Sequence, residues 1–348
     1  MAIFVHEKNA GKVELAFTHA SFVAGKTSNA YSWDGVKTVK LNAIITQPIN
    51  DYNRTAEGNR YGVPQELQDY QHILSVEEDK SFSIVIDDGN NSEQDMMKQA
   101  GIVMKAELNE QVTPYADRHA FKKWCAGAGQ SIGTTEPTKE TIIADLVEIE
   151  TKLADKLVPT EGRYVYVANK YVGELRQALT NCDSITDKLL LKGVVGDFGT
   201  LHIVGVPGAW LPEGVYMLAT YKEAVLMPKK LHKSIIHNNP QGYSGNVLEG
   251  RFLFDAHVIG MKCDGVIVVC AAAKVVATPV ITKGTSTTTI AITGTGTIKY
   301  TTDGSDPRFS NTAQTYSTAI NNLATGEKIR AVGVGTGMYV SDIAELTF

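Results

Sequence analysis

The composition of the chain changes abruptly near Ala271, and this break limits the fold more than any other feature. Beyond it there is no Cys or His, and short runs of Thr, Ile, Val and Ala alternate with Gly or Asn. Such runs are typical of strands, and the Gly-rich joints of turns. Short strands at this spacing predict a small β-sandwich, joined to the rest by a linker at residues 271–274. The predicted strands are residues 287–292, 297–300 and 328–332.

Length and composition fit one large domain in front of this small one. The 348 residues are 43% hydrophobic and 20% charged, which is enough for a large apolar core. The formal net charge of -5 gives no basic field that would draw the chain onto nucleic acid or anionic lipid. The N-terminus reaches the charge pair Glu7 and Lys8 before it builds an apolar run, and no stretch approaches the ~20 apolar residues of a membrane span. We therefore expect a cytosolic protein that is not a dedicated nucleic-acid binder.

The cysteines and histidines show no pattern of a metal or catalytic site. Cys125, Cys182, Cys263 and Cys270 lie far apart, without a Cys-x-x-Cys pair. This spacing argues against a zinc site and a disulfide framework, so we expect reduced, mostly buried thiols. The eight histidines form no His-x-x-x-His pair. The sequence therefore predicts no catalytic residue, no metal and no cofactor.

Two segments with alternating apolar residues, 39–45 and 82–86, flank a polar stretch. Alternation of this kind predicts strands. Residues 50–62 between them are polar, aromatic and punctuated by Gly, and no monomer core would bury them. The sequence therefore predicts a long hairpin arm with the two segments as its strands and an exposed tip.

A helix is predicted directly after the arm. Residues 87–91 have turn composition, and Ser92 with Asp95 three residues later has the form of an N-terminal capping box. Apolar residues follow at helical spacing, which predicts a helix over residues 92–112, ended by Pro114. The acidic residues at its start, which we interpret as solvated caps favoured by the helix dipole, are Asp87, Asp88, Glu93 and Asp95.

The rest of the large domain is predicted to mix helices and strands. An amphipathic helix is expected over residues 139–157, before Pro159. Beyond it the pattern alternates without a regular β-α-β repeat, and the last strand is apolar enough to be central in a sheet. An α+β body follows. Its further predicted elements are a helix at 170–179 and strands at 164–167, 201–206, 214–220 and 258–270.

Two Gly-rich segments, 127–133 and 333–337, have a superficial likeness to phosphate-binding loops. Neither lies between a strand and a well-marked helix, and neither carries a Lys-Ser or Lys-Thr pair. We interpret both as flexible loops.

The order of arm, capped helix and mixed body resembles the major capsid proteins of tailed bacteriophages, which share the Hong Kong 97-type fold. Asp51-Tyr52-Asn53-Arg54 is similar to the arm tip in one branch of that family. Residues 82–87 and the helix through Pro114 are similar to the passage from arm to spine helix, and residues 255–266 to the final strand pair. The resemblance implies an N-terminal arm (1–30), an extended hairpin loop (31–91), a spine helix with the peripheral domain (92–137), an axial domain (138–225), return strands (226–270) and a surface domain (271–348).

The last part of the chain resembles the immunoglobulin-like domain at the C-termini of chitobiase-type glycosidases. Its most specific string is Tyr300-Thr301-Thr302-Asp303-Gly304-Ser305-Asp306-Pro307. We expect a tight turn here, in which Gly304 supplies the unusual dihedral angles while Asp303 and Asp306 cap the backbone. Calcium binding is the alternative, but the loop lacks the spaced oxygen ligands and distal Glu of a dedicated site.

The resemblance to capsid proteins implies a structural subunit and no enzyme. In that family many copies pack as hexamers and pentamers around double-stranded DNA, with a portal and in some cases a separate scaffolding protein. It implies that the arm tip, Tyr52, Asn53 and Arg54, contacts a neighbouring subunit. The immunoglobulin-like domain would decorate the outside of the virion, for adhesion to glycans or a cell surface or for added stability. Assembly would take place in the cytoplasm of a bacterial host.

The basic cluster of Lys229, Lys230, His232 and Lys233 leaves three interpretations open. It contacts packaged DNA, it contacts a neighbouring subunit, or it is a solvated loop. Three rivals to the capsid hypothesis also remain: an encapsulin shell of the same fold, a tail protein, and a glycosidase with an accessory domain. A glycosidase would need paired carboxylates and a secretion signal, neither of which is apparent.

Overall fold

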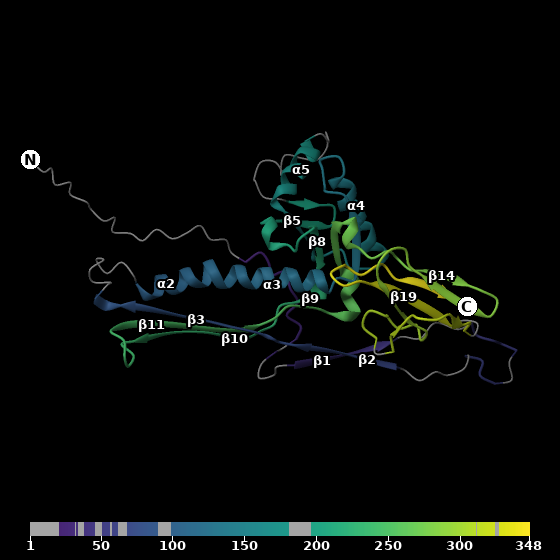
Figure 1. Ribbon diagram of the computed structural model, residues 1–348, viewed down its shortest axis with the longest axis horizontal. Coiled ribbons are helices and arrows are strands. Elements are labelled where there is room, and N and C mark those ends of the chain that lie inside the picture. Colours follow the sequence, from purple (N-terminus) through teal and green to yellow (C-terminus); the bar gives the residue numbers. More distant parts are fainter. Residues whose placement is uncertain are drawn as a thin grey trace, which may run out of the picture.

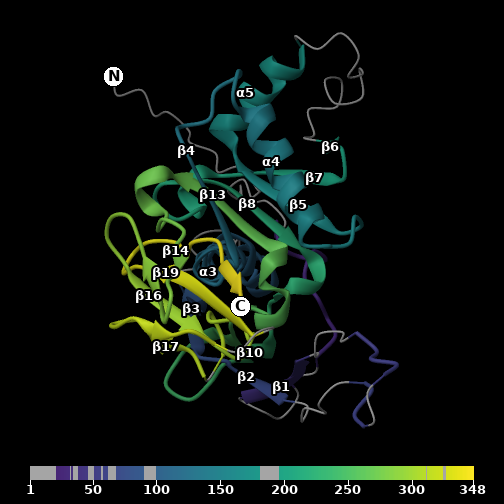
Figure 2. The same cartoon turned by 90° about the vertical axis from the view of Figure 1, so that its right-hand side faces the viewer.

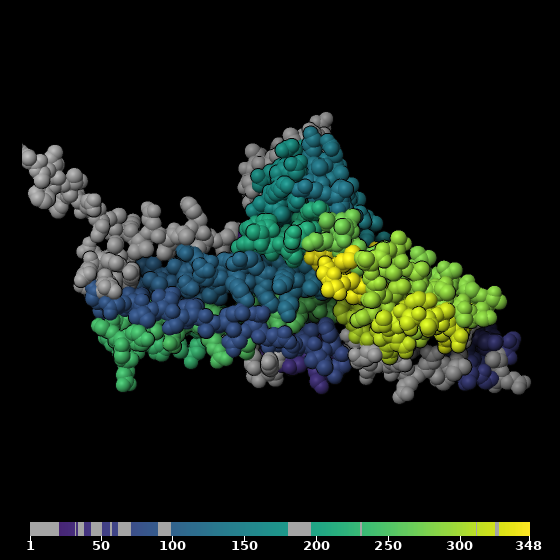
Figure 3. Space-filling view, viewed as in Figure 1, coloured from purple at the N-terminus to yellow at the C-terminus, as the bar shows by residue number. Residues whose placement is uncertain are grey.

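The computed structural model describes residues 21–31, 33, 38–45, 51–55, 58–61, 68–89, 99–180, 196–310, 312–323 and 327–348. A long helix lies along a three-stranded sheet and forms an elongated base, and a compact α+β block rises from it (Figure 1). The C-terminal domain, in yellow, continues the base on the side opposite the free end of the long helix (Figure 3).

The long helix consists of α2 (Ala100–Glu107), a π-helical turn (Leu108–Val112) and α3 (Thr113–Ala126). The prediction that Pro114 ends the helix is wrong. Proline has no N–H, and in a regular helix its ring clashes with the carbonyl four residues earlier. Here the N–H of Thr113 bonds to the carbonyl of Leu108, five residues back. The wide turn places Pro114 in the first turn of α3, where proline is accepted. The predicted cap at Ser92 and Asp95 lies outside the described residues.

Three antiparallel strands support this helix: β10 (Lys229–Asn238), β11 (Gly245–Phe254) and β3 (Glu78–Asp87), in that order. Ile86 and Leu248 are buried against Met104 of α2. Gly250 is required because a Cβ atom there would lie 2.4 Å from the ring of Phe82. The loop interpretation of the basic cluster is wrong, because its residues belong to β10 and pair with β11.

The hairpin arm is formed by β1 (Thr38–Ile45) and β2 (Gln68–Ser75). The predicted strand at 39–45 is confirmed, but its predicted partner is wrong. Residues 82–86 lie in β3, which pairs with β11 from Gly245↔Asp87 to Phe254↔Glu78. Alternation shows that a strand has one buried face, and it does not show which strand is its neighbour. The base of the arm packs in a cluster of Trp33, Leu74, Val76, Leu226 and Ile259.

The compact block is a six-stranded mixed sheet in the order β4-β13-β8-β5-β7-β6, and it confirms the α+β prediction. The β13–β4 and β5–β7 pairs are parallel, and the other pairs are antiparallel. Strand β13 lies inside the sheet, as its apolar sequence predicts. The bounds are β4 (Gln130–Thr134), β5 (Arg163–Ala168), β6 (Asp197–Phe198), β7 (Leu201–Val206), β8 (Val215–Tyr221) and β13 (Val266–Ala271), and the short pair β9 (Val225–Leu226) and β12 (His257–Val258) lies beside it.

Two helices belong to this block, α4 (Ile142–Asp155) and α5 (Asn169–Thr180), and both were predicted. Ile142, Leu146, Ile149 and Leu153 of α4 are buried. Leu157, the last residue of the predicted amphipathic helix, is 90% exposed, because the helix has ended and the residue has a left-handed φ of 54°. The core also contains Cys125, Cys263 and Cys270 as free thiols, and burial raises the pKa of Cys270 to about 11. Cys182 lies outside the described residues.

The predicted flexible loop at 127–133 is wrong, because Gln130–Thr134 forms β4. Gly129 precedes it, and a Cβ atom there would lie 2.5 Å from the backbone of Cys263, so the close approach requires glycine. The second predicted loop is also wrong in part, since Gly333 and Val334 end a strand.

The C-terminal domain is a β-sandwich of two sheets, and its three predicted strands are confirmed. Ile290, Ile298, Ile329 and Ala331 are buried between the sheets. One sheet has the order β14-β15-β18 and the other β17-β16-β19-β20. The bounds are β14 (Val280–Lys283), β15 (Thr287–Ala291), β16 (Thr297–Thr301), β17 (Gln314–Thr315), β18 (Ile320–Asn321), β19 (Lys328–Val334) and β20 (Ala344–Thr347).

Short 3-10 turns connect several of these strands. The predicted linker contains one of them, Ala272–Lys274. The other 3-10 segments are Gly208–Trp210, Lys222–Ala224 and Gly260–Gly265.

Candidate interaction surfaces

The arm tip is internally ordered. The N–H of Asn53 donates to the carbonyl of Arg60 at 3.0 Å, and the Asn53 side-chain oxygen accepts from the N–H and hydroxyl of Thr55 at 3.0 and 2.8 Å. Tyr52 and Tyr61 pack edge to face with ring centroids 5.0 Å apart. Tyr52 is 49% exposed and Tyr61 is 83% exposed, and Arg54 beside them is also exposed. The tip therefore presents two tyrosines and an arginine, the residue types most enriched at energetically dominant interface positions.

The turn predicted in the C-terminal domain has capped geometry. Gly304 has a φ of 76°, and the Asp303 carboxylate accepts from the N–H of Ser305 at 3.0 Å and from the hydroxyl of Thr312 at 2.6 Å. Asp306 accepts from the N–H of Arg308 at 2.9 Å. Burial alone would raise the pKa of Asp303, but the hydrogen bonds from Ser305 and Thr312 hold it below its usual value. Backbone and side-chain donors thus occupy both carboxylates.

This turn faces the large domain. The side chain of Arg308 is only 5% exposed and lies 2.8 Å from the carboxylate of Asp264, and it also donates to the carbonyl of Gly129. Figure 2 shows the C-terminal domain between the six-stranded sheet above and the hairpin arm below. Sequence reasoning missed this docking role, because Asp264 and Gly129 are far from Arg308 along the chain.

Further contacts fix the same joint. The N–H of Tyr339 donates to the carbonyl of Lys274 at 2.7 Å, and the N–H of Val276 to the carbonyl of Tyr339 at 3.1 Å. The Ser131 hydroxyl donates to the carbonyl of Val340 at 2.7 Å. Lys152 pairs with Asp342 at 2.9 Å. The C-terminal domain is therefore docked on the body by side-chain and backbone bonds.

Ser131 also lies in a Gly-x-Ser-x-Gly string, Gly129-Gln130-Ser131-Ile132-Gly133, which has the spacing of a hydrolase nucleophile motif. That motif places its serine on a sharp turn between a strand and a helix. Here Ser131 lies within β4, is buried, and uses its hydroxyl for the contact with Val340. The geometry gives it a structural role.

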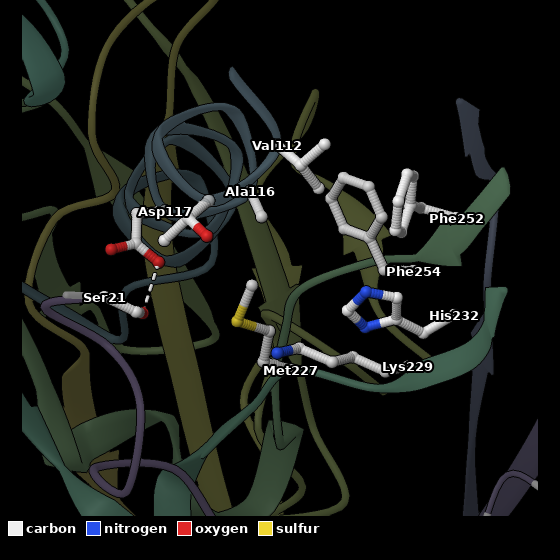
Figure 4. Close-up of a pocket in the computed structure, with 10 residues that line it drawn as sticks. Ser21, Val112, Ala116, Asp117, Met227, Lys229, His232, Phe252 and Phe254 are labelled. Carbon is white, nitrogen blue, oxygen red and sulfur yellow. Dashed lines mark hydrogen bonds between the residues drawn. The ribbon is translucent and has the colours of Figure 1, made fainter. Parts of the chain in front are cut away.

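The basic side chains that the structure describes do not form one patch. Lys229 and His232 line a cavity of about 90 Å³ beneath α3, together with Phe252 and Phe254 (Figure 4). Lys233 pairs across the sheet with Arg251 and is exposed. The side chain of Lys230 is outside the described residues.

The same cavity contains a buried carboxylate that sequence reasoning missed. Asp117 of α3 is 1% exposed and accepts from the Ser21 hydroxyl at 2.7 Å and the N–H of Phe22 at 2.8 Å (Figure 4). Burial raises the pKa of Asp117 despite these bonds and the positive charges of Lys229 and Lys26. Phe22 packs edge to face on Trp210 at 5.3 Å. Asp117 thus fastens the start of the described chain to the long helix.

Replacing Asp117 with asparagine should loosen this attachment. The substitution keeps the size of the side chain but replaces one carboxylate oxygen with an amide donor. Either the N–H of Phe22 or the hydroxyl of Ser21 then loses its acceptor. An unsatisfied buried group costs about 1–3 kcal/mol. We expect faster trypsin cleavage at Lys26 and a small loss of thermal stability. Asp155→Asn, on the exposed end of α4, is the matched control and should change neither. Equal cleavage rates in wild type and Asp117→Asn would contradict the attachment.

Among the described residues, no group of three or more His, Cys, Asp and Glu side chains is arranged to hold a metal ion. In the same part of the chain, no helix has the length and apolarity needed to cross a membrane.

Comparison with solved structures identifies the fold. The capsid structure of cyanophage P-SCSP1u matches with a TM-score of 0.60, 15% identity, and coverage of 77% of this chain and 93% of that one. This chain has the phage capsid fold. The same fold matches the structure titled Mycobacterium phage Che8 (TM-score 0.65, 16% identity, 76% of this chain and 97% of that one). It also matches the asymmetric unit of the bacteriophage PhiM1 mature capsid (TM-score 0.55, 13% identity, 77% and 92%).

The other comparisons concern sequence. A family model described as Fn3 associated matches residues 288–348, which agrees with the immunoglobulin-like sandwich observed there. No curated protein matches the chain. The capsid fold is therefore recognised through structure, and the appended domain through sequence as well.

Proposed function

We propose that this chain is the major capsid subunit of a tailed bacteriophage, a structural protein without catalytic activity. The observation that carries the proposal is the capsid fold itself, with a hairpin arm extending from it. A two-stranded hairpin is marginally stable alone in water. The base of this one packs on its own body, and among the described residues the tip exposes two tyrosines and an arginine. A neighbouring copy that receives the tip would supply the missing contacts.

In this proposal many copies assemble as hexamers and pentamers into the head of a virion with a portal as a further partner, and scaffolding is either a separate protein or dispensed with. Weak net acidity suits a shell that encloses DNA, since a surface that gripped phosphates tightly would resist packaging. The axial domain at 138–225 and the outward-facing surface domain at 271–348 are assigned as the resemblance implies, whereas the arm is limited to β1, β2 and the segment that joins them, because β3 pairs with β11. Lys229, Lys230 and Lys233 are assigned to subunit or DNA contacts, and the surface domain to glycan or cell-surface contact.

Assembly of the purified full chain tests this function. We expect closed shells of uniform size by electron microscopy, alone or after co-expression with a scaffolding protein, because subunit contacts repeated over a shell reinforce one another. A salt and concentration series covers conditions in which charged interfaces are screened. Recovery of only monomers or enzyme-sized oligomers throughout the series would overturn the proposal.

A further inference from the structure

Four parts of the chain meet at the base of the hairpin arm. They are β2, the segment from Asp255 to Gly260, the helix α3 and the turn of the C-terminal domain. We call this meeting point the arm junction and define it by His72, Asp255, His257, Gly260 and Phe309. It contains two histidines, His72 of β2 and His257 of β12.

His72 of β2 contacts both the body and the C-terminal domain. Its Nδ1 accepts the N–H of Gly260 at 3.3 Å, so this nitrogen carries no proton. Its ring lies 6.0 Å from that of Phe309, the residue that follows the docking arginine Arg308. A Cβ atom on Gly260 would lie 3.3 Å from both His72 and Phe309, so the three groups are in mutual contact. A proton on Nδ1 would face the N–H of Gly260 and remove this hydrogen bond.

His257 lies on the other side of the junction. Its ring stacks on Trp33 at 6.1 Å, and its Nε2 is buried without a hydrogen-bond partner among the described residues. A carboxylate oxygen of Asp255 lies 3.9 Å from this nitrogen. Asp255 is 0% exposed and already accepts from His119 at 2.8 Å and from the N–H groups of Ala256 at 2.8 Å and Glu77 at 3.2 Å.

The pKa values show which groups respond to acid. Burial, and then the charge of His257, hold the pKa of His72 below its usual 6.5. Burial likewise lowers the pKa of His257. Asp255, a hydrogen bond with the Ser75 backbone and Glu77 oppose this effect, and Lys123 of α3 reinforces it. Burial alone would raise the pKa of Asp255, but the hydrogen bond from His119 and the neighbouring charges lower it to about 2.

The lowered pKa values of His72 and His257 determine how closure of the junction depends on pH. Asp255 stays ionised above pH 4, so it does not change charge in mildly acidic solution. Both histidines are harder to protonate in the closed junction than in an open one. Closure is therefore unaffected well above pH 6.5 and is progressively disfavoured as the pH falls below that value. The other charged groups that face the junction are Glu78 from β3, which lies 4.0 Å from His119, and Arg308 from the C-terminal domain, whose guanidinium lies 5.7 Å from the Phe309 ring.

We propose that the arm junction is an acid-sensitive latch: protonation of His72 and His257 releases the base of the hairpin arm from the body and from the C-terminal domain. The latch lies within one subunit, so the proposal goes beyond the capsid function and does not depend on it. Its test uses unassembled full-length protein.

Hydrogen–deuterium exchange at pH 7.5 and 5.5, corrected for the intrinsic pH dependence of exchange, measures the release. We expect the amides of β1 and β2 to exchange several-fold faster at pH 5.5 than at pH 7.5, because both histidines bind protons more readily in the open junction than in the closed one. The sheet β4-β13-β8-β5 should not change. Equal exchange of the arm at both pH values, or a uniform increase over the whole chain, would overturn the proposal whatever the variants do.

Variants separate the latch from general acid effects. His72→Asn places an amide oxygen where Nδ1 stands, so it accepts from Gly260 without titrating, and with His257→Asn it should remove most of the pH response. His202→Asn, at an exposed histidine beside Asp197, is the matched control and should keep the full response. Phe309→Ala should raise exchange of the arm at both pH values. A wild-type pH response in the double variant would show that other groups control the arm.

Discussion

Replacing Arg308 with alanine is expected to release the C-terminal domain and to lower the free energy of unfolding by about 3 kcal/mol. Breaking a buried ion pair costs about 3–5 kcal/mol because the remaining partner is left charged and unpaired. Arg308 is 5% exposed, but Asp264 and Asp306 are 32% and 24% exposed, so water recovers part of the loss and the lower figure applies. Chemical denaturation and limited proteolysis between residues 271 and 280 measure the two effects.

Arg251→Ala is the matched control for this experiment. Arg251 forms an equally close two-pronged pair with Asp79, at 3.0 and 2.6 Å, but the partners are 62% and 42% exposed. Exposed pairs contribute little to stability, because water solvates and screens both charges. If Arg308→Ala destabilises the protein no more than Arg251→Ala, Arg308 does not fasten the domain, and the other contacts of the joint are sufficient.

Replacing Arg54 with glutamate is expected to block or severely weaken shell assembly while the subunit stays folded. The bonds that order the tip involve Asn53, Thr55 and Arg60 and leave Arg54 out, so little local structure is lost. Arginine suits a two-pronged contact with carboxylates or carbonyls of a neighbour. Losing a bonded interface charge costs about 2–5 kcal/mol at each site, and a shell repeats the loss in every copy. Sedimentation, electron microscopy and circular dichroism of the free subunit measure assembly and folding.

Lys299→Glu provides the control for Arg54→Glu. It makes the same change in net charge at an exposed position of the C-terminal domain, far from the arm tip in sequence. It should assemble normally. Shells of Arg54→Glu that form in normal yield and resist heat as well as wild type would show that Arg54 is solvated, and the contact assigned to the tip would be withdrawn.

Local patterns in the sequence determined most of the secondary structure. The helix α4 follows from apolar residues at Ile142, Leu146, Ile149 and Leu153, and the central strand β13 from the unbroken run Val266–Cys270. The composition break near Ala271 separated the sandwich from the body. Such features depend on neighbours within a few residues, where backbone periodicity alone decides which side chains share a face.

Tertiary structure decided which elements meet. Residues 82–86 were correctly expected to form a strand, but their partners in β11 lie 160 to 168 residues later in the chain. The proline expected to end the first helix lies inside it, because a π turn removes the clash. The exposure of Tyr52 and Arg54 at the arm tip was predicted from composition. The Asp117 attachment, the Arg308 joint and the arm junction were not, because each depends on a buried charge or ring whose partner lies far away in sequence. No local pattern encodes such a pair, since burial and distance are set only when the whole chain packs.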